Sequence, residues 1–252
     1  MALSVHAAAI ASGPLARANP LAKLLACFVV GLGAALTSDP LTPALVLAGA
    51  VAALAVGGVR LGVLLRRGWP VLVSAVGLGL TTLAFGDSDQ PWLTALAMTV
   101  RVLAIALPGV AALLTIDPTD LADSLVQQAR MPARFAYASL AALRLLPLLA
   151  LEWQTLTQAR RARGVDAGRN PVARLRLFLS VTFTLLVGAV RRGTRLAIAM
   201  DARGFDAAGP RTIARPQQLR ASDIAWVIGS LVVLVAAVAI SSAAGIFRPA
   251  WA

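Results

Sequence analysis

The sequence predicts an all-α protein: a polytopic membrane helix bundle with about five transmembrane spans and two long cytoplasmic helices. Three observations support this prediction. Hydrophobic residues make up 59% of the 252-residue chain and charged residues only 13%, whereas a soluble domain carries about 25% charged residues. Apolar runs of spanning length recur along the chain. Arginines gather between some of these runs and are absent between others.

Five apolar runs are the predicted spans, and polar segments separate them. A spanning helix needs roughly 20 apolar residues, and the first run is shorter than that. The runs are Leu24–Leu36, Leu41–Val59, Trp69–Gly86, Trp92–Ile116 and Ile224–Phe247. We therefore expect one integral membrane domain, with an N-terminal bundle at 1–116, a cytoplasmic region at 117–222 and a last span within 223–252.

The placement of basic residues predicts the orientation of the chain. Lys and Arg are enriched in the cytoplasmic loops of membrane proteins. Arg17 and Lys23 precede the first span and three arginines lie in the loop at 60–67, whereas the loops around Asp39 and at 87–90 contain no basic residue. The sequence therefore predicts a multi-pass protein of the cell membrane with a cytoplasmic N-terminus.

The formal net charge of +12 has the same origin. Basic residues at the cytoplasmic ends of spans account for it, and no soluble basic domain is present that could hold DNA or RNA. We therefore expect the chain to contact the lipid bilayer and to bind no nucleic acid.

The region from 117 to 223 contains two apolar pieces, Phe135–Leu151 and Leu177–Val190, separated and followed by arginine clusters. If only the first piece crossed the membrane, the arginines between the pieces would lie outside. If only the second crossed, the two clusters would lie on opposite sides, and its 14 residues are short for a span. We expect both pieces to stay cytoplasmic, as long helices whose apolar flanks pack against the membrane bundle. A pair of true spans is the alternative.

A nine-residue pattern occurs twice in this region. Residues 159–167 and 199–207 both read Ala-x-x-Ala-Arg-Gly-x-Asp-Ala, and each ends a helix-like run. Glycine after the last turn adopts the left-handed conformation and stops the helix. The preceding arginine complements the negative end of the helix dipole, and its fork can pair with a carboxylate. One copy would be a common helix ending, but two copies predict twin docking tips for a partner with two equivalent sockets, such as a dimer.

Several further motifs accompany the repeats. Residues 19–24 read Asn-Pro-Leu-Ala-Lys-Leu, and 115–121 read Thr-Ile-Asp-Pro-Thr-Asp-Leu. Leu-Arg-Leu-Leu-Pro at 143–147 precedes Glu152, and Arg211-Thr212 follows the second repeat. In combination these motifs resemble those of the transmembrane coupling subunit, or T component, of energy-coupling factor (ECF) importers. That family has Asp-Pro-Arg-x-Lys-Leu near its N-terminus, so Asn and Leu depart from its pattern here.

The resemblance implies an importer subunit rather than an enzyme. Members of the family use two cytoplasmic coupling helices, ending in Ala-Arg-Gly-type motifs, to dock onto two ABC-type ATPases, and their membrane bundle holds one substrate-binding S component. ATP-driven movement then drives uptake of a vitamin, a vitamin precursor or a transition-metal ion. The ATPase-coupling residues that the resemblance assigns are Ala162, Arg163, Gly164, Ala202, Arg203 and Gly204.

Three more side chains are candidates for a structural role or for contact with the S component: Arg101, Arg144 and Glu152. Arg101 lies within an apolar run, where an ionisable group is costly. We expect it to bond backbone carbonyls or a threonine inside the bundle. Glu152 is the only glutamate, and we expect it to form an ion pair with a neighbouring arginine.

Catalytic chemistry is not expected. His6 and Cys27 are the only histidine and cysteine, too few for a metal site or an acid–base cluster. No Gly-x-x-x-x-Gly-Lys-[Ser/Thr] loop is present and Lys23 is the only lysine, so ATP hydrolysis must belong to another polypeptide. We predict no enzymatic activity, cofactor or metal. The alternative function is a self-contained secondary carrier, which would place polar groups in broken helices near the midplane.

Overall fold

The structure is a computed structural model that describes residues 13–86, 90–165, 168, 170–205, 213 and 215–246. The regular elements of this part of the chain are helices. Their bounds are α2 Pro14–Arg17, α3 Pro20–Ala35, α4 Leu41–Val56, α5 Leu61–Phe85, α6 Pro91–Thr115, α7 Pro118–Gln127, α8 Ala133–Ala162, α9 Pro171–Ala202 and α10 Ala221–Ala243. The predicted all-α fold class is confirmed.

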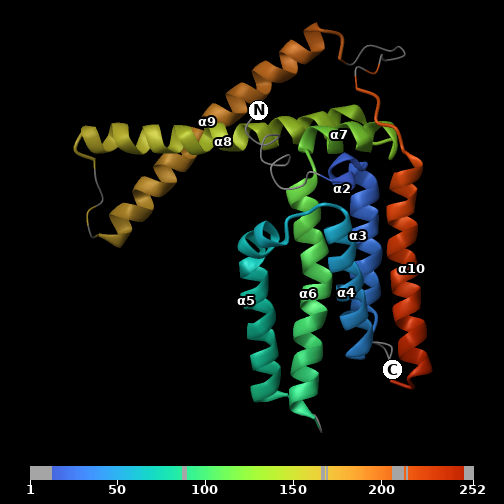
Figure 1. Ribbon diagram of the computed structural model, residues 1–252. Coiled ribbons are helices and arrows are strands. Elements are labelled where there is room, and N and C mark those ends of the chain that lie inside the picture. Colours follow the sequence, from blue (N-terminus) through green and yellow to red (C-terminus); the bar gives the residue numbers. More distant parts are fainter. Residues whose placement is uncertain are drawn as a thin grey trace. The chain divides into compact units, whose positions relative to one another are not determined.

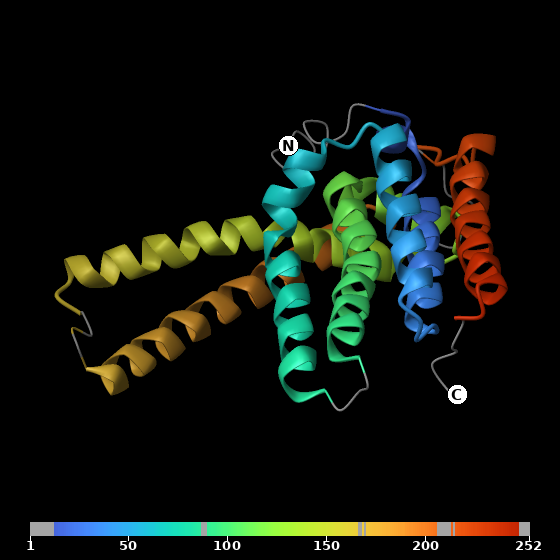
Figure 2. The ribbon, with the colours of Figure 1, turned by 60° about the horizontal axis from the view of Figure 1, so that its bottom comes forward.

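The chain divides into two compact units, one made of residues up to Met131 and from Pro216 onward, the other of Pro132–Arg215. In the first unit α3, α4, α6 and α10 pack together and α5 packs on α6, so these five helices form a bundle (Figures 1 and 2). Helix α7 packs on α3. We call the end of the bundle where α3 begins the Lys23 end, and the opposite end the Asp39 end. The second unit contains α8 and α9.

Small side chains bring the helices of the bundle close together. One buried cluster in the bundle consists of Val30, Ala34, Val46, Ala104 and Ala237. Two glycines, one in α3 and one in α4, pack so closely against α10 that an added Cβ atom would clash with its side chains. A Cβ atom on Gly33 would lie 2.2 Å from Leu234 Cδ1, and one on Gly49 would lie 2.4 Å from Val233 Cγ1. Close backbone approach at small residues is a typical way for helices to associate in a membrane.

We expect Gly33→Ala to destabilise the bundle, because the new methyl group must displace Leu234; overpacking of this kind costs about 1–3 kcal/mol. The matched control is Gly77→Ala in α5, where a Cβ atom would meet nothing within 4 Å. There the change should be neutral or stabilising, since glycine costs up to about 1 kcal/mol relative to alanine inside a helix. Thermal unfolding of both variants in detergent measures the difference. Equal stability would show that α10 can shift freely against α3.

The outside of the bundle is apolar. Phe28, Val73, Leu80 and Phe85 expose 63%, 59%, 61% and 86% of their surface. Soluble proteins rarely expose large contiguous apolar areas, whereas a lipid-facing surface has to be apolar. Helices α5, α6, α8, α9 and α10 are long and apolar enough to cross a membrane, and α3 and α4 are shorter apolar helices of 16 residues. The chain is therefore a multi-pass membrane protein.

Helices α3 and α5 begin before the predicted apolar runs, whereas α4 ends at Val56 rather than Val59. Helix α3 begins at Pro20 rather than Leu24, because Lys23 lies inside it with its ammonium group hydrogen-bonded. Helix α5 begins at Leu61 rather than Trp69, and Arg66 and Arg67 are exposed on its first turns. The apolar pieces of the second unit likewise belong to longer helices, of 30 residues in α8 and 32 in α9. Length and composition alone do not distinguish a spanning role of α8 and α9 from a cytoplasmic one.

Three helices begin with the same local signal, an Asn or Asp followed by proline. The side chains of Asn19, Asp117 and Asn170 accept hydrogen bonds from the backbone N–H groups at the starts of α3, α7 and α9. Each of these helices has its proline at the first position, where no backbone donor is needed. The starts of these three helices are therefore encoded locally.

A buried carboxylate links two helices by hydrogen bonds at the Asp39 end of the bundle. Asp39 is 1% exposed, and its Oδ2 accepts hydrogen bonds from the Thr42 backbone N–H at 2.7 Å and from Ser241 Oγ at 2.6 Å. Burial raises the pKa of Asp39, but these hydrogen bonds outweigh that effect and hold the pKa below its usual value. Asp39 thereby joins the start of α4 to the end of α10.

Candidate functional site

The two Ala-Arg-Gly motifs form helix ends with the same geometry. Arg163 and Arg203 are the C-cap residues of α8 and α9, with φ/ψ of −89°/9° and −91°/9°. The glycines after them, Gly164 and Gly204, have φ of +76° and +73°. The predicted left-handed glycines are therefore confirmed.

The backbone hydrogen bonds of the two ends also match. Gly164 N donates to Arg161 O at 2.9 Å, and Val165 N donates to Arg160 O at 3.0 Å. In the second copy Gly204 N donates to Asp201 O, and Phe205 N donates to Met200 O, at the same two distances. This pair of bonds is the Schellman motif, which satisfies the last carbonyls of a helix.

The glycine cap alone is not specific to α8 and α9. Helix α4 ends with Gly58 and α10 ends with Gly245, both at positive φ and with equivalent backbone bonds. The residue before the first of these glycines is Gly57 and the residue before the second is Ala244, so neither cap has an arginine at this position. The distinguishing feature of α8 and α9 is thus the arginine at the C-cap position.

Both C-cap arginines lie at the surface of the protein. Arg163 and Arg203 are exposed, as are the flanking alanines and glycines. Within the described residues neither guanidinium group has a hydrogen-bond or ion-pair partner, whereas Arg160 in the same turn donates to Ser180 O and Thr184 Oγ1 at 3.4 and 3.3 Å. The C-cap arginines are therefore available to another molecule.

The tips lie at opposite ends of an antiparallel helix pair. Near the end of α8, Arg160 contacts Thr184 in the middle of α9. Near the start of α8, the Tyr137 ring packs against Phe205, just after α9, with ring centroids 6.2 Å apart. Arg163 lies 26 residues beyond Tyr137 (163 − 137), or about 39 Å along α8 at 1.5 Å per residue. The two arginines can therefore contact two separate subunits or sockets.

An ion pair and an aromatic contact lie where α8 and α9 cross. Glu152 Oε2 and Arg192 Nη2 are in direct contact, with their side chains 33% and 38% exposed. Trp153, next to Glu152, packs against Phe178 with ring centroids 5.2 Å apart. The expected ion pair of Glu152 is confirmed, although the sequence did not indicate which arginine it would choose.

The other two candidates lie elsewhere. Arg144 is exposed on α8. Arg101 is half-buried in α6, and its Nη2 donates to the carbonyl of Thr37, just beyond the end of α3. This bond to a backbone carbonyl is what a structural role predicts. A contact of Arg101, Arg144 or Glu152 with an S component stays a prediction.

Several residues of the motifs lie outside the described part of the chain. They are His6, Asp87, Asp89, Asp166, Ala167, Arg169, Asp206, Ala207, Arg211, Thr212 and Phe247.

Sequence reasoning missed a polar cluster at the Lys23 end of the bundle. Lys23 is 5% exposed. Its ammonium group donates to Thr115 O at 3.2 Å and to Ala16 O at 3.5 Å. Two of the motifs noted above, at 19–24 and 115–121, therefore meet in space. The signal that could have revealed this was the sole lysine of the chain lying inside an apolar helix.

Asp223 ties the last helix to the same cluster. It is 1% exposed, and its Oδ1 accepts from the backbone N–H of Asn19 at 2.9 Å. Its Oδ2 accepts from the backbone N–H of Arg220 at 2.8 Å and so caps α10. One carboxylate thus joins the starts of α3 and α10, although 204 residues separate Asn19 from Asp223.

We expect Asp223→Ala to destabilise the bundle strongly, because it leaves two backbone donors without partners, at roughly 1–3 kcal/mol for each buried group. The matched control is Asp201→Ala, which removes an exposed carboxylate from α9. Thermal unfolding in detergent should show a lower midpoint for the first variant only. Equal midpoints would mean that water replaces the carboxylate of Asp223 at no cost.

Comparison with known proteins shows which family the chain resembles. A family model described as CbiQ, cobalt transport protein, matches residues 11–213. Among similar proteins, the energy-coupling factor transporter transmembrane protein EcfT of Limosilactobacillus fermentum is 32% identical over 153 residues, 58% of this chain and 56% of that protein. EcfT of Bacillus subtilis is 33% identical over 131 residues, 49% of each chain.

EcfT of Listeria innocua is 29% identical over 183 residues, 69% of this chain and 66% of that protein. The chain thus spans about half the length of the first two relatives and somewhat more of the third. The matched family region contains α3 to α9, including both Ala-Arg-Gly ends. Because the family model matches most of its length, the chain belongs to the CbiQ family of cobalt transport proteins.

Proposed function

We propose that the chain is the transmembrane energy-coupling subunit of an ECF-type ABC importer. In this role Arg163 and Arg203 each dock into one of two ABC-type ATPase subunits. The movement of these ATPases on ATP binding and hydrolysis is passed through α8 and α9 to a membrane-embedded S component, which carries the substrate. The chain itself performs no catalysis. The substrate class is a vitamin, a vitamin precursor or a transition-metal ion.

The observation that carries this proposal is the matched pair of helix ends. Two exposed arginines lie on rigid, glycine-capped tips at opposite ends of one helix pair, and neither has a partner among the described residues. A planar guanidinium group pairs with a carboxylate through two parallel hydrogen bonds, so each tip suits a socket with an acidic residue. The ion pair between Glu152 and Arg192 would make the two tips move together.

The S component would meet the apolar surfaces of the chain. Helices α8 and α9 expose many large apolar side chains, among them Leu148, Leu151, Phe183 and Leu186, at 52–67% exposure. A helix pair that only bridged solvent would be polar on all sides. Apolar faces on arginine-tipped helices therefore favour a partner that is itself apolar, such as a membrane-embedded subunit or the membrane surface.

The test is purification of the tagged chain together with the products of the neighbouring genes. Two ATPase subunits and one small membrane protein should co-purify, and ATP-dependent uptake should require all of them. Uptake by the chain alone in liposomes, driven by an ion gradient, would instead identify a self-contained secondary carrier.

The proposed orientation places the N-terminus, residues 117–222 and both tips in the cytoplasm. Single cysteines at Asp166 and Asp206, in a Cys27→Ala background, should react with a membrane-impermeant thiol reagent only after the cells are opened. A cysteine at Gln90, in the loop without basic residues, should react in intact cells. Reaction at Asp166 or Asp206 from outside would make α8 or α9 a span and would contradict the coupling role.

A further inference from the structure

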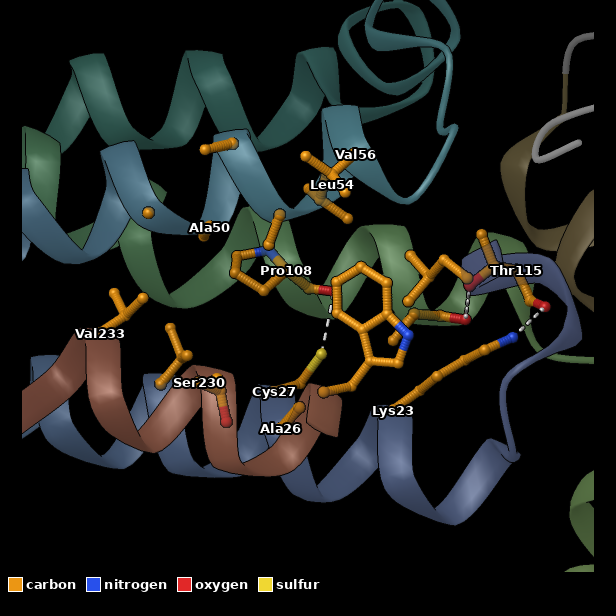
Figure 3. A pocket seen from close by; sticks show the side chains of 18 of the residues that line it. Lys23, Ala26, Cys27, Ala50, Leu54, Val56, Pro108, Thr115, Ser230 and Val233 are labelled. Carbon is orange, nitrogen blue, oxygen red and sulfur yellow. Dashed lines mark hydrogen bonds between the residues drawn. The ribbon is translucent and has the colours of Figure 1, made fainter. Parts of the chain in front are cut away.

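The bundle contains a pocket that the proposed coupling does not use. It has a volume of about 440 Å³ and is lined by residues of α2, α3, α4, α6 and α10 (Figure 3). Pockets for small ligands measure about 300–1,000 Å³. The lining is almost entirely apolar and includes Val30, Leu54, Pro108 and Val233. The pocket therefore has the size and chemistry for one apolar ligand or chain.

The lining residues extend from the Lys23 end of the bundle to about its middle. The pocket is lined by residues 23–30 of α3 and 225–233 of α10, which begin at that end, and by the second half of α4 and of α6, which finish there. Toward the Asp39 end, Val233 closes on Gly49, where a Cβ atom would lie only 2.4 Å from Val233 Cγ1. The pocket thus lies within one leaflet of a membrane that surrounds the bundle.

Four polar groups of the lining are already hydrogen-bonded. The Lys23 ammonium group donates to Thr115 O, and the Cys27 thiol donates to Pro108 O (Figure 3). The hydroxyl groups of Thr115 and Ser230 donate to carbonyls of their own helices. A polar ligand would find few partners here, and an apolar cavity does not hold water. Because the pocket is not fully enclosed and lies at membrane depth, a lipid chain is the apolar group that can fill it.

Two exposed arginines lie within a few residues of the contact between α2 and the end of α4 at the Lys23 end of the bundle. The backbone N–H of Leu15, a lining residue, donates to Gly57 O at 3.3 Å and ties α2 to the end of α4. Arg17 follows Leu15 by two residues and Arg60 follows Gly57 by three, and both are exposed. Arg60 also lines an open hollow with Arg66 and Arg67. These charges favour a phosphate group over a neutral head group at this end.

We propose that this pocket binds one acyl chain of an anionic phospholipid from the leaflet at the Lys23 end, with the lipid phosphate held by Arg17 and Arg60. The proposal does not depend on the coupling function. A bound chain would fill the space between α3, α4 and α10 and would restore the packing contacts that an empty pocket lacks.

The first experiment fills the pocket. Gly229 lines it, and a Cβ atom there would meet nothing within 4 Å, so Gly229→Phe introduces a ring at an open position of the pocket wall. Gly77→Phe in α5 is the control, since that site is equally open but lies outside the pocket. Full-length protein in detergent is titrated with phosphatidylglycerol, and native mass spectrometry counts the bound lipid. We expect Gly229→Phe to weaken binding at least about tenfold, equivalent to losing two buried methylene groups, and Gly77→Phe to have no effect.

The second experiment begins with the unmodified pocket, so its main readout is obtained on the natural chain. Trp226 lines the pocket, and phosphatidylglycerol brominated on its chains should quench its fluorescence. Quenching should fall in Trp226→Phe. Phosphatidylcholine with the same chains and free oleate should bind more weakly, and Arg17→Gln with Arg60→Gln should remove the preference for phosphatidylglycerol. Unchanged binding in Gly229→Phe, no loss of quenching in Trp226→Phe, or equal binding of all three lipids would each overturn the proposal.

Discussion

Replacing both Arg163 and Arg203 by alanine is expected to release the ATPases and abolish uptake, while the protein still reaches the membrane. Each guanidinium group is proposed to pair with a carboxylate that is shielded from water once the subunits dock. Truncating one partner of such a pair costs about 2–5 kcal/mol, much of it because the opposite charge is left unpaired. Two such losses correspond to a fall in affinity of at least about three orders of magnitude.

The single variants should be milder than the double variant. With one tip intact, the second contact is intramolecular and is supported by a high effective concentration. The tips also differ in charge, because Arg160 and Arg161 accompany Arg163 whereas Asp201 accompanies Arg203. Arg161 is exposed and can supply some of the lost attraction, so Arg163→Ala should weaken the complex less than Arg203→Ala.

The measurements are co-purification of the ATPases and substrate uptake. Arg176→Ala with Arg195→Ala is the matched control, because it removes two exposed arginines from the same helix pair without touching the tips. Lysine at positions 163 and 203 should restore function only in part, since it keeps the charge but loses the planar fork. If the double alanine variant retains full assembly and transport, the motifs are only helix ends and the coupling proposal is wrong.

Valine at Gly164 or Gly204 is expected to misdirect the tip and to weaken ATPase binding without unfolding the bundle. Both glycines adopt positive φ, a region in which a β-branched residue costs of the order of 1–3 kcal/mol. Around Gly164 the cause can be isolated, because a Cβ atom there would meet nothing within 4 Å. Backbone strain, and not a steric clash, would therefore change the direction of Arg163.

The control for this prediction is Gly193→Val. Gly193 lies inside α9, where a Cβ atom would also meet nothing within 4 Å, and its φ is not positive. This variant should assemble normally. Binding of the ATPases and thermal unfolding are measured together for all three variants. A capping role would be contradicted by normal assembly of Gly164→Val and Gly204→Val, or by equal loss in Gly193→Val.

Much of the fold could be predicted from the sequence because it depends on local properties. Hydropathy identified all five helices of the bundle but not their exact ends. An apolar segment in a membrane has to be helical because only then are its backbone N–H and C=O groups hydrogen-bonded within the segment. Asn19 before Pro20 and Gly164 after Arg163 mark helix ends for reasons that involve only a few neighbouring residues. The repeated tip was found for the same reason.

The contacts between distant segments could not be predicted, because they depend on which helices meet. Charge alone required a partner for Glu152, but only the crossing of α8 and α9 selects Arg192 from the arginines nearby. The sequence likewise left Lys23 without a partner, while the fold gives it the Thr115 carbonyl.

The sequence by itself thus determined the class of the protein, its helices and its twin arginine tips, all of which follow from composition and short-range backbone geometry. The tertiary structure decided the placement of the tips at opposite ends of one antiparallel pair and the joining of α3 to α10 through Asp223. It also created the apolar pocket between α3, α4, α6 and α10. These features require residues up to 204 positions apart to meet, and only the packing of the folded helices brings them together.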